Sequence, residues 1–393
     1  MHDTAAHLVD RILPIVPYRQ RVIAYPKWLR ILLARDAGIM SKARNIFLAS
    51  IFVWQRKQAR KKGIEGRIGV GAISFDQRFG DSLNLSPHTH AVIPDGVFTI
   101  EKNKAIFHRI QNPRDDDVQR INERIVSKIR RMLEQKGLIR EQEDSEEITP
   151  DTMDLLALTI QRTAQRKNLN NNESRPRSRL SSGIEGFSLQ AGTHVHENDR
   201  EGLEHLCGYG ARPSIALTRL KRHEDGKYEY SLKYPLPNGE CRLILTGQQM
   251  MARLALLVPR PKIHLIHYTG VFAANSNWRK IIVPKSLDSK CKHCNQITEE
   301  HCSDEVHKIF KSDCYIASQE PNPRERYLDW ASLMKRVYGK DILNCSECGK
   351  PRKIIAYIDD PPIVRKILIH LGMPTTGPPR SPARPRPQLE LFV

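Results

Sequence analysis

The residues with the clearest chemical potential are two histidines, His88 and His90, which are separated by Thr89. They lead into the apolar run Ala91-Val92-Ile93, which ends at the turn-forming residues Pro94-Asp95-Gly96. A short apolar run before such a turn predicts a β-strand, and side chains two positions apart on a strand point to the same face. Both imidazoles can then bind one metal ion and leave coordination positions open for substrate oxygen atoms. The alternative for this spacing is the polar edge of an ordinary strand.

The composition indicates a nucleic-acid partner. The chain has 393 residues, room for two or three domains, with a formal net charge of +19 and a pI near 9.7. Such an excess of cations favours binding to a polyanion, although a merely soluble basic protein is the alternative. The sequence contains no run of about twenty apolar residues of the kind that predicts a membrane span, and its first residues lack the features of a signal peptide. We expect a cytoplasmic, nucleoid-associated protein, whose eight cysteines are reduced thiols or zinc ligands.

The histidine strand and its surroundings resemble the insertion-sequence-ninety-one family of rolling-circle transposases. These are HUH enzymes, named for a His-hydrophobic-His metal site. The resemblance implies an α+β fold with a central antiparallel sheet flanked by helices, and Mg²⁺ or Mn²⁺ as the bound metal. Thr89 departs from the pattern, but it suits a strand and is expected on the face away from the histidines, so Thr89→Val should be tolerated. The matching segments are Gly71–Phe75, Gln77–Gly80, Leu83–Leu85, His88–His90 and Asp95–Phe98.

A predicted helix that Asn198 or Asp199 can cap carries Tyr209. The segment Leu203–Pro213 resembles the catalytic-tyrosine segment of the family. Two-tyrosine members have a second tyrosine four residues earlier, where this chain has His205, so the resemblance implies a single-tyrosine form. Attack of a phenol oxygen on a DNA phosphate would form a phosphotyrosine ester and free a 3′-hydroxyl, which allows the strand to be rejoined.

The resemblance leaves the third metal ligand open. Many relatives have a histidine where this chain has Gln190, and a glutamine carbonyl can bind a hard cation. Asp76 and Gln77, on the neighbouring predicted strand, are alternatives. We predict a metal site made of His88, His90 and Gln190, with Asp76 and Gln77 as the alternatives to Gln190.

A rival metal site is present further along the chain. His194 and His196 flank a valine and thus form a literal His-hydrophobic-His, and they also precede the tyrosine. They lack the flanking residues that mark the metal strand of the family. We therefore expect replacement of both to leave most activity, whereas His88→Ala should abolish it.

The amino-terminal part is predicted to be helical and basic. Apolar spacing interrupted by prolines predicts helices over residues 7–36, and Ser41 is a candidate N-cap for a helix that runs to residue 62. Family members have a cysteine-rich zinc-binding segment before this region. This chain begins about where that segment would end, so the resemblance implies a form that lacks it. Contact with DNA phosphates, or a solvated helix end, would account for the cations Arg56, Lys57, Arg60, Lys61 and Lys62.

The carboxy-terminal half contains two C-x-x-C pairs. Four thiolates make a closed structural Zn²⁺ site, and free reduced cysteines are the alternative. The fifty-residue gap between the pairs is long for one zinc ribbon, so Cys302 and Cys314 offer another way to complete a site with the first pair. The pairs are Cys291 with Cys294, and Cys345 with Cys348.

These observations predict four segments and one activity. The segments are a helical, basic DNA-contacting region (1–62), an HUH core (63–235) with a charged insertion (about 100–183), a carboxy-terminal DNA-binding region with the cysteine pairs (236–372) and a disordered tail (373–393). We predict a transposase that nicks and rejoins single-stranded DNA at transposon ends, with Tyr209 as the nucleophile and Arg212 in contact with DNA. A catalytically inactive DNA-binding remnant is the main alternative, and a hydrolase of another class is a distant third. The target sequences and the oligomeric state do not follow from the sequence.

Overall fold

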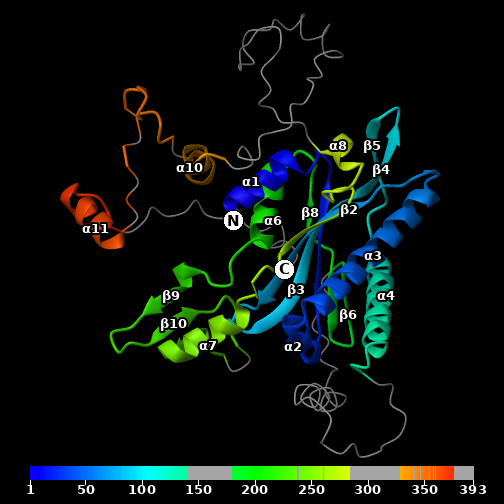
Figure 1. The fold of residues 1–393 in the computed structure, drawn as a ribbon, viewed down its shortest axis with the longest axis horizontal. Helices are drawn as coiled ribbons and strands as arrows, with labels where there is room; N and C mark the ends of the chain where they lie inside the picture. Colours follow the sequence, from blue (N-terminus) through cyan, green and yellow to red (C-terminus); the bar gives the residue numbers. More distant parts are fainter. Residues whose placement is uncertain are drawn as a thin grey trace, which may run out of the picture.

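The computed structural model describes residues 1–139, 179–236, 239–259, 261–283, 328–339, 341–345, 347–353, 355–356, 358 and 360–375. These residues form a mixed α+β structure in which helices flank a central antiparallel sheet, so the predicted fold class is confirmed (Figure 1). In the described part of the chain, no helix is long and apolar enough to cross a membrane.

The central sheet has seven strands, paired in the order β12-β2-β3-β1-β7-β6, with β8 pairing to β1. Each of these pairings is antiparallel. Strands β2 and β3, and strands β6 and β7, are consecutive in the sequence, whereas β12 beside β2, β1 beside β3 and β7 beside β1 come from distant parts of the chain. Their bounds are β1 (Tyr18–Ala24), β2 (Gly71–Phe79), β3 (Leu85–Pro94), β6 (Ser181–Ile184), β7 (Phe187–Gln190), β8 (His194–Val195) and β12 (Ile266–Gly270).

Strand β1 corrects the expectation that residues 7–36 are helical throughout. It lies between β3 and β7, where it is hydrogen-bonded on both sides. The preceding helix ends at Arg11, and Pro14 keeps it from continuing because proline cannot donate the helical hydrogen bond. The sheet therefore takes strands from the predicted regions 1–62, 63–235 and 236–372, so its core is shared among three of the predicted segments.

Helices cover both faces of the sheet. The first face is covered by α1 (His2–Arg11) and α6 (Arg200–Gly210), which pack against each other, and we call it the α6 face. The other, which we call the α3 face, is covered by α2 (Lys27–Arg35), α3 (Ala37–Lys61) and α4 (Asp115–Glu134). Each face has its own hydrophobic core, and alternate residues of β2 and β3 contribute to the two cores.

Helix α3 begins earlier than the sequence suggested. Its N-cap is Asp36, whose carboxylate accepts hydrogen bonds from the backbone of Gly38 and Ile39, whereas Ser41 lies inside the helix. The helix is 25 residues long, and at ~1.5 Å per residue it extends for about 37 Å along the sheet. Its first turns lie beside the start of β12, where Arg44 contacts His267, and its last turns carry the predicted cation run.

Smaller elements surround this core. A hairpin is formed by β4 (Gly96–Glu101) and β5 (Lys104–Arg109). A second, three-stranded sheet packs with one helix around a separate apolar cluster. Its elements are η2 (Leu217–Arg219), β9 (Leu220–Arg222), β10 (Tyr228–Ser231), β11 (Arg242–Leu245) and α7 (Gly247–Leu257). The remaining helices are α8 (Arg279–Ile282), α10 (Trp330–Tyr338) and α11 (Pro361–His370).

Candidate active site

Strand β3 presents both histidines on the α6 face. His88 is in register with Ala24 of β1, and His90 with Val22, so the two side chains lie on the same side of the sheet. Their ring centroids are 4.9 Å apart, with an angle of 68° between the ring planes. Thr89 points to the α3 face, as the alternation predicts. Two imidazoles at this separation can bind one metal ion together.

Tyr209 lies beside this pair. Its ring centroid is 5.5 Å from that of His90, and the two rings meet edge to face at 85°. Helix α6 carries the tyrosine, and it contacts both β2 and β3. The structure therefore brings together His88, His90 and Tyr209, which the sequence singled out separately.

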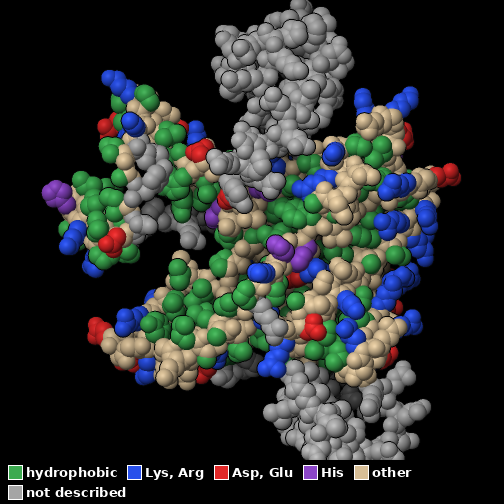
Figure 2. Space-filling view, viewed as in Figure 1, with side chains coloured by type: hydrophobic (Ala, Val, Ile, Leu, Met, Phe, Trp, Pro, Cys, Tyr) green, Lys and Arg blue, Asp and Glu red, His purple; other side chains and the backbone are tan. Residues whose placement is uncertain are grey.

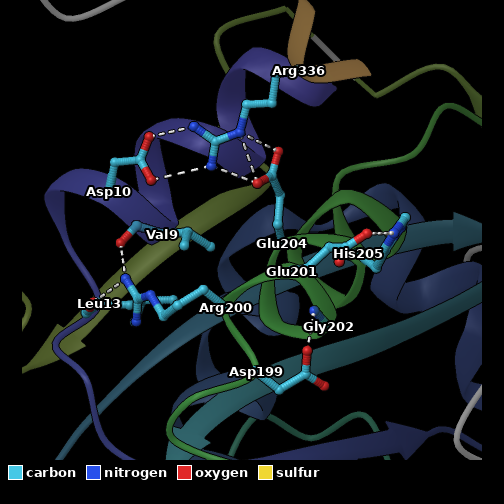
Figure 3. Close-up of polar contacts among 10 residues, drawn as sticks. All are labelled: Val9, Asp10, Leu13, Asp199, Arg200, Glu201, Gly202, Glu204, His205 and Arg336. Atoms are coloured by element: carbon cyan, nitrogen blue, oxygen red, sulfur yellow. Dashed lines mark hydrogen bonds and ion pairs between the residues drawn. The ribbon is translucent and has the colours of Figure 1, made fainter. Parts of the chain in front are cut away.

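The start of α6 is fixed to α1 by polar contacts (Figure 3). Asp199 caps the helix by accepting a hydrogen bond from the backbone of Gly202, at 2.8 Å. Arg200 turns towards α1 and donates to the backbone carbonyls of Val9 and Leu13 at the end of that helix. Because a guanidinium has five donors in a rigid fork, one side chain can satisfy several carbonyls that a helix end leaves unpaired.

A second arginine ties the carboxy-terminal region to the same helix. Arg336 of α10 donates to both carboxylate oxygens of Glu204 on α6 and also pairs with Asp10 of α1 (Figure 3). These hydrogen bonds raise the pKa of Arg336. The helix that carries the tyrosine is thus attached at one end to two other helices.

The end of α6 is fixed to β2. Gly210 has no side chain, and a Cβ there would lie 2.6 Å from the ring of Phe75, so only glycine allows this approach. The side-chain amide of Gln77 donates to the carbonyls of Tyr209 and Gly210, both at 2.9 Å. These contacts hold the backbone of the tyrosine against the histidine strand.

A cation lies against the tyrosine ring. The guanidinium carbon of Arg212 is 4.2 Å from the centroid of Tyr209 and 5.2 Å from that of Phe79. Its Nε is buried and has no hydrogen-bond partner among the described residues. A cation in this position can neutralise an anionic oxygen beside the phenol. The predicted DNA-contacting residue Arg212 therefore lies within the histidine–tyrosine cluster.

The protonation of His88 suits a metal ligand. Its Nδ1 donates to the carbonyl of Ser86 at 2.7 Å, which leaves the lone pair on Nε2. Burial lowers the pKa of His88, against the hydrogen bond to Ser86, which raises it. A neutral imidazole with a fixed tautomer is the form that binds divalent cations.

His90 is held by a residue that the sequence did not reveal. The side-chain amide nitrogen of Gln20, on β1, lies 3.0 Å from Nδ1 of His90. In this orientation the amide N–H donates to Nδ1. If the amide is rotated by half a turn, its oxygen accepts a hydrogen bond from Nδ1–H, and the lone pair of the ring is then on Nε2. Gln20 can therefore hold the ring in the tautomer that binds a metal. The signal was hidden because residues 18–24 read as helical.

The third ligand remains a choice between glutamines. Gln190 lies on the α6 face, but it is exposed and two strands away from His90, with Val22 between them. Gln77 is in register with His88, and its Oε1 is buried without a hydrogen-bond partner among the described residues. An orphaned carbonyl oxygen beside a histidine suits a hard cation. In the described part of the chain, no three His, Cys, Asp or Glu side chains form a metal-binding group.

Asp76 and His194, one histidine of the rival pair, point elsewhere. Asp76 is in register with Thr89, so it lies on the α3 face, away from the histidine pair. His194 is in register with Arg19, on the same α3 face, and its Nε2 lies 3.6 Å from a carboxylate oxygen of Asp95. Asp95 in turn forms a buried ion pair with Arg19. His194 is therefore on the other side of the sheet from Tyr209.

The cysteine pairs are described only in part. Cys291, Cys294, Cys302 and Cys314 lie outside the described residues. Hydrogen bonds from the backbone of Cys348 and of Glu347 lower the pKa of Cys345 to about 6, and Arg352 also donates to its sulfur. A lowered thiol pKa favours the thiolate that Zn²⁺ binds, but the zinc site itself stays a prediction.

The predicted cation run forms one surface on α3. Arg56, Lys57, Arg60 and Lys61 line a pocket together with Val53, whereas Lys62 donates to the carbonyl of Arg109. Figure 2 shows lysine and arginine side chains concentrated over α3 and α4. On α4, the exposed residues Arg120, Arg124, Lys128 and Arg131 have helical spacing that places them on one side.

One comparison with known proteins identifies the family. A family model described as "Putative transposase" matches residues 71–279, which is more than half of the chain. The matched region contains the histidine strand β3, the tyrosine helix α6 and strand β12. No curated protein and no solved structure matches the chain. The chain therefore belongs to this family of transposases, which are enzymes that transfer DNA strands.

Proposed function

We propose that this transposase nicks and rejoins single-stranded DNA through a covalent 5′-phosphotyrosine at Tyr209, as an HUH enzyme similar to the insertion-sequence-ninety-one family. The observation that carries the proposal is the cluster of three rings, in which Tyr209 lies edge to face against His90 and His90 lies 4.9 Å from His88. Such a cluster on one face of a rigid sheet provides a nucleophile beside two ligands for a phosphate-bound cation.

The reaction is a transesterification. The phenol oxygen of Tyr209 attacks the scissile phosphorus, the bond from phosphorus to the 3′ oxygen breaks, the phenol loses its proton and the departing 3′ oxygen takes one up. Because an ester replaces an ester, a new 3′-hydroxyl can reverse the step and rejoin the strand. Arg212 stabilises the anionic phosphate beside the phenol. When His88 and His90 hold Mg²⁺ or Mn²⁺, the chemistry supplied there is polarisation of the phosphate oxygens.

The basic surface supports a DNA substrate. The cations of α3 and α4 lie on the α3 face, so DNA bound there must pass around the sheet to reach Tyr209. Contacts to phosphates release counterions, and the binding constant then falls steeply with salt. We assign α3 the role of holding the DNA backbone while the α6 face performs the chemistry.

The test is adduct formation on labelled DNA. Single-stranded oligonucleotides that tile both strands of the DNA flanking the coding sequence, labelled at the 3′ end, are incubated with protein and Mn²⁺. The wild type should yield labelled protein that survives denaturation, and Tyr209→Phe and His88→Ala should yield none. The matched control replaces His194 and His196 together by alanine, and it should retain most adduct.

Other outcomes would assign another function. Cleavage without a denaturation-resistant adduct would mean hydrolysis by water, and Tyr209 would not be the nucleophile. Salt-sensitive binding with no cleavage of any oligonucleotide would identify a DNA-binding remnant. Loss of the adduct in the His194/His196 variant, with activity retained in His88→Ala, would move the site to the other face of the sheet.

A further inference from the structure

A pocket on the α3 face is not used by the proposed chemistry. It has a volume of about 240 Å³ and lies where the last turn of α2, the first turns of α3 and the end of β2 meet the loop before β12. The apolar part of its wall includes Ala34, Met40 and Ile263. Drug-sized ligands occupy pockets of roughly 300 to 1,000 Å³, so this one suits a smaller group.

The polar side of the pocket is a preorganised network. Asp76 is 8% exposed; its Oδ1 accepts from Thr89 at 2.8 Å, and its Oδ2 pairs with Arg44 and lies 3.3 Å from His267. Arg44 also donates to the hydroxyl of Ser41. The carboxylate is therefore already neutralised, and the side chains around it are fixed in place.

This network offers hydrogen bonds to a neutral ligand. The Nη atoms of Arg44 are engaged by Asp76, His267 and Ser41, while its Nε has no partner among the described residues. His267 is 23% exposed on its side chain and lines the pocket. Apolar walls with a few fixed donors and acceptors are what a flat heteroaromatic ring requires, because its faces are apolar and its edge is polar.

The pocket adjoins the histidine–tyrosine cluster through two residues. Gln77 lines the pocket and also donates to the carbonyls of Tyr209 and Gly210. Pro87 lines the pocket and immediately precedes His88. The pairing of β2 with β12 ends at Phe75, and the backbone N–H of Asp76 donates to the carbonyl of Leu265, so the pocket lies at the end of this pairing.

We propose that this pocket binds one unstacked nucleobase of the single-stranded DNA, next to the nucleotide whose phosphate reaches the cluster. The assignment rests on the proposed function for its ligand, and it adds a site that reads or anchors the strand. Helix α3 supports this path, because it lines the pocket at Arg44 and carries the cation run from Arg56 onward. At ~1.5 Å per residue, Arg44 and Arg60 are about 24 Å apart along the helix, so the cations can continue to hold the backbone.

The test compares bases with an abasic backbone. Binding of a fluorescent 20-nucleotide thymidine oligomer, and of the same oligomer built from abasic residues, is measured by anisotropy in the presence of EDTA. Two variants fill the pocket from opposite walls, Met40→Trp on α3 and Ile263→Trp on the loop. The matched control, Ile31→Trp, adds the same ring at an exposed position of α2 outside the pocket.

Both filling variants should bind the thymidine oligomer about tenfold more weakly than the wild type, because one base contact is lost. Their binding to the abasic oligomer, and that of Ile31→Trp to both oligomers, should be unchanged. The pocket holds no base if both filling variants melt like the wild type and bind the thymidine oligomer with wild-type affinity. The same conclusion follows if their affinity for the abasic oligomer falls as much as their affinity for the thymidine oligomer. Tyr209→Phe separates this proposal from the nicking activity, because it should keep the wild-type preference for the thymidine oligomer over the abasic oligomer. If the wild type forms no adduct while this preference persists, only the nicking proposal fails.

Discussion

Gln20 gives the sharpest test of how the histidine pair is held. Its amide contacts Nδ1 of His90 at 3.0 Å, and the residue is only 7% exposed, so water cannot readily replace the contact. Gln20→Leu removes the hydrogen-bond partner of Nδ1. Gln20→Glu supplies a carboxylate that only accepts, which forces the proton onto Nδ1 and the lone pair onto Nε2.

The magnitude follows from the role of such a partner. Loss of a hydrogen bond to the second nitrogen of a metal-binding histidine weakens metal affinity by about 10- to 100-fold, or about 1.4 to 2.8 kcal/mol. We therefore expect Gln20→Leu to bind Mn²⁺ weaker by this factor. Gln20→Glu should bind at least as tightly as the wild type, since a carboxylate raises the basicity of the imidazole.

Isothermal titration with Mn²⁺ measures both variants, with His88→Ala as the reference for a lost ligand and Gln135→Leu as the control at an exposed glutamine. Thermal melting checks that each variant is folded. Wild-type affinity in Gln20→Leu, with binding lost in His88→Ala, would refute the reasoning, because His90 would then be oriented by something other than Gln20. An equal loss in the glutamate variant would show that the proton on Nδ1 does not matter.

Three further results are expected. Thr89→Val leaves the histidine face unchanged, so activity should be kept, but it should lower the free energy of unfolding in urea by about 1 to 2 kcal/mol, because the fully buried hydroxyl donates to Asp76. An unchanged free energy of unfolding would contradict this bond. Arg200→Ala should lower the free energy of unfolding in urea by about 2 kcal/mol and reduce adduct formation, because it removes the hydrogen bonds that fix the start of α6 to α1. A loss of stability with full adduct formation would mean that these hydrogen bonds do not position the tyrosine. At pH 7, iodoacetamide should modify Cys345 faster than Cys207, as measured by mass spectrometry, because hydrogen bonds lower the pKa of Cys345 to about 6 whereas burial raises the pKa of Cys207 to about 12. The rate at Cys345 should rise as the pH passes through 6, the value of its lowered pKa. Equal rates at the two cysteines would argue against this difference in pKa.

Local patterns in the sequence were enough to predict the strand and the helix that carry the candidate site. The two-residue spacing of His88 and His90, followed by an apolar run and a turn, predicted a strand with both imidazoles on one face, and β3 has this form. A cap followed by helical spacing predicted the helix of Tyr209, and Asp199 caps α6. These features depend on neighbours in the chain, so the sequence contains them directly.

The fold class followed from the resemblance, but the order of strands did not follow from the sequence. Residues 18–24 form the strand beside the histidines, although their local pattern favoured a helix, because pairing on both sides outweighs local propensity. Strand β12, from the carboxy-terminal half, closes the other side of β2. Strand pairing joins residues far apart in the chain, and no local period reports it.

Only the tertiary structure shows which groups surround the histidine–tyrosine cluster. Register places Gln20 and Gln77 beside the histidines, and it turns Asp76 and His194 to the opposite face. A shift of one residue in any of these pairings would exchange the two faces. The sequence favoured His88 and His90 over the later pair through the flanking residues of the resemblance, not through any knowledge of the faces. The face on which each histidine lies depends on long-range hydrogen bonding between strands, which only the folded chain defines.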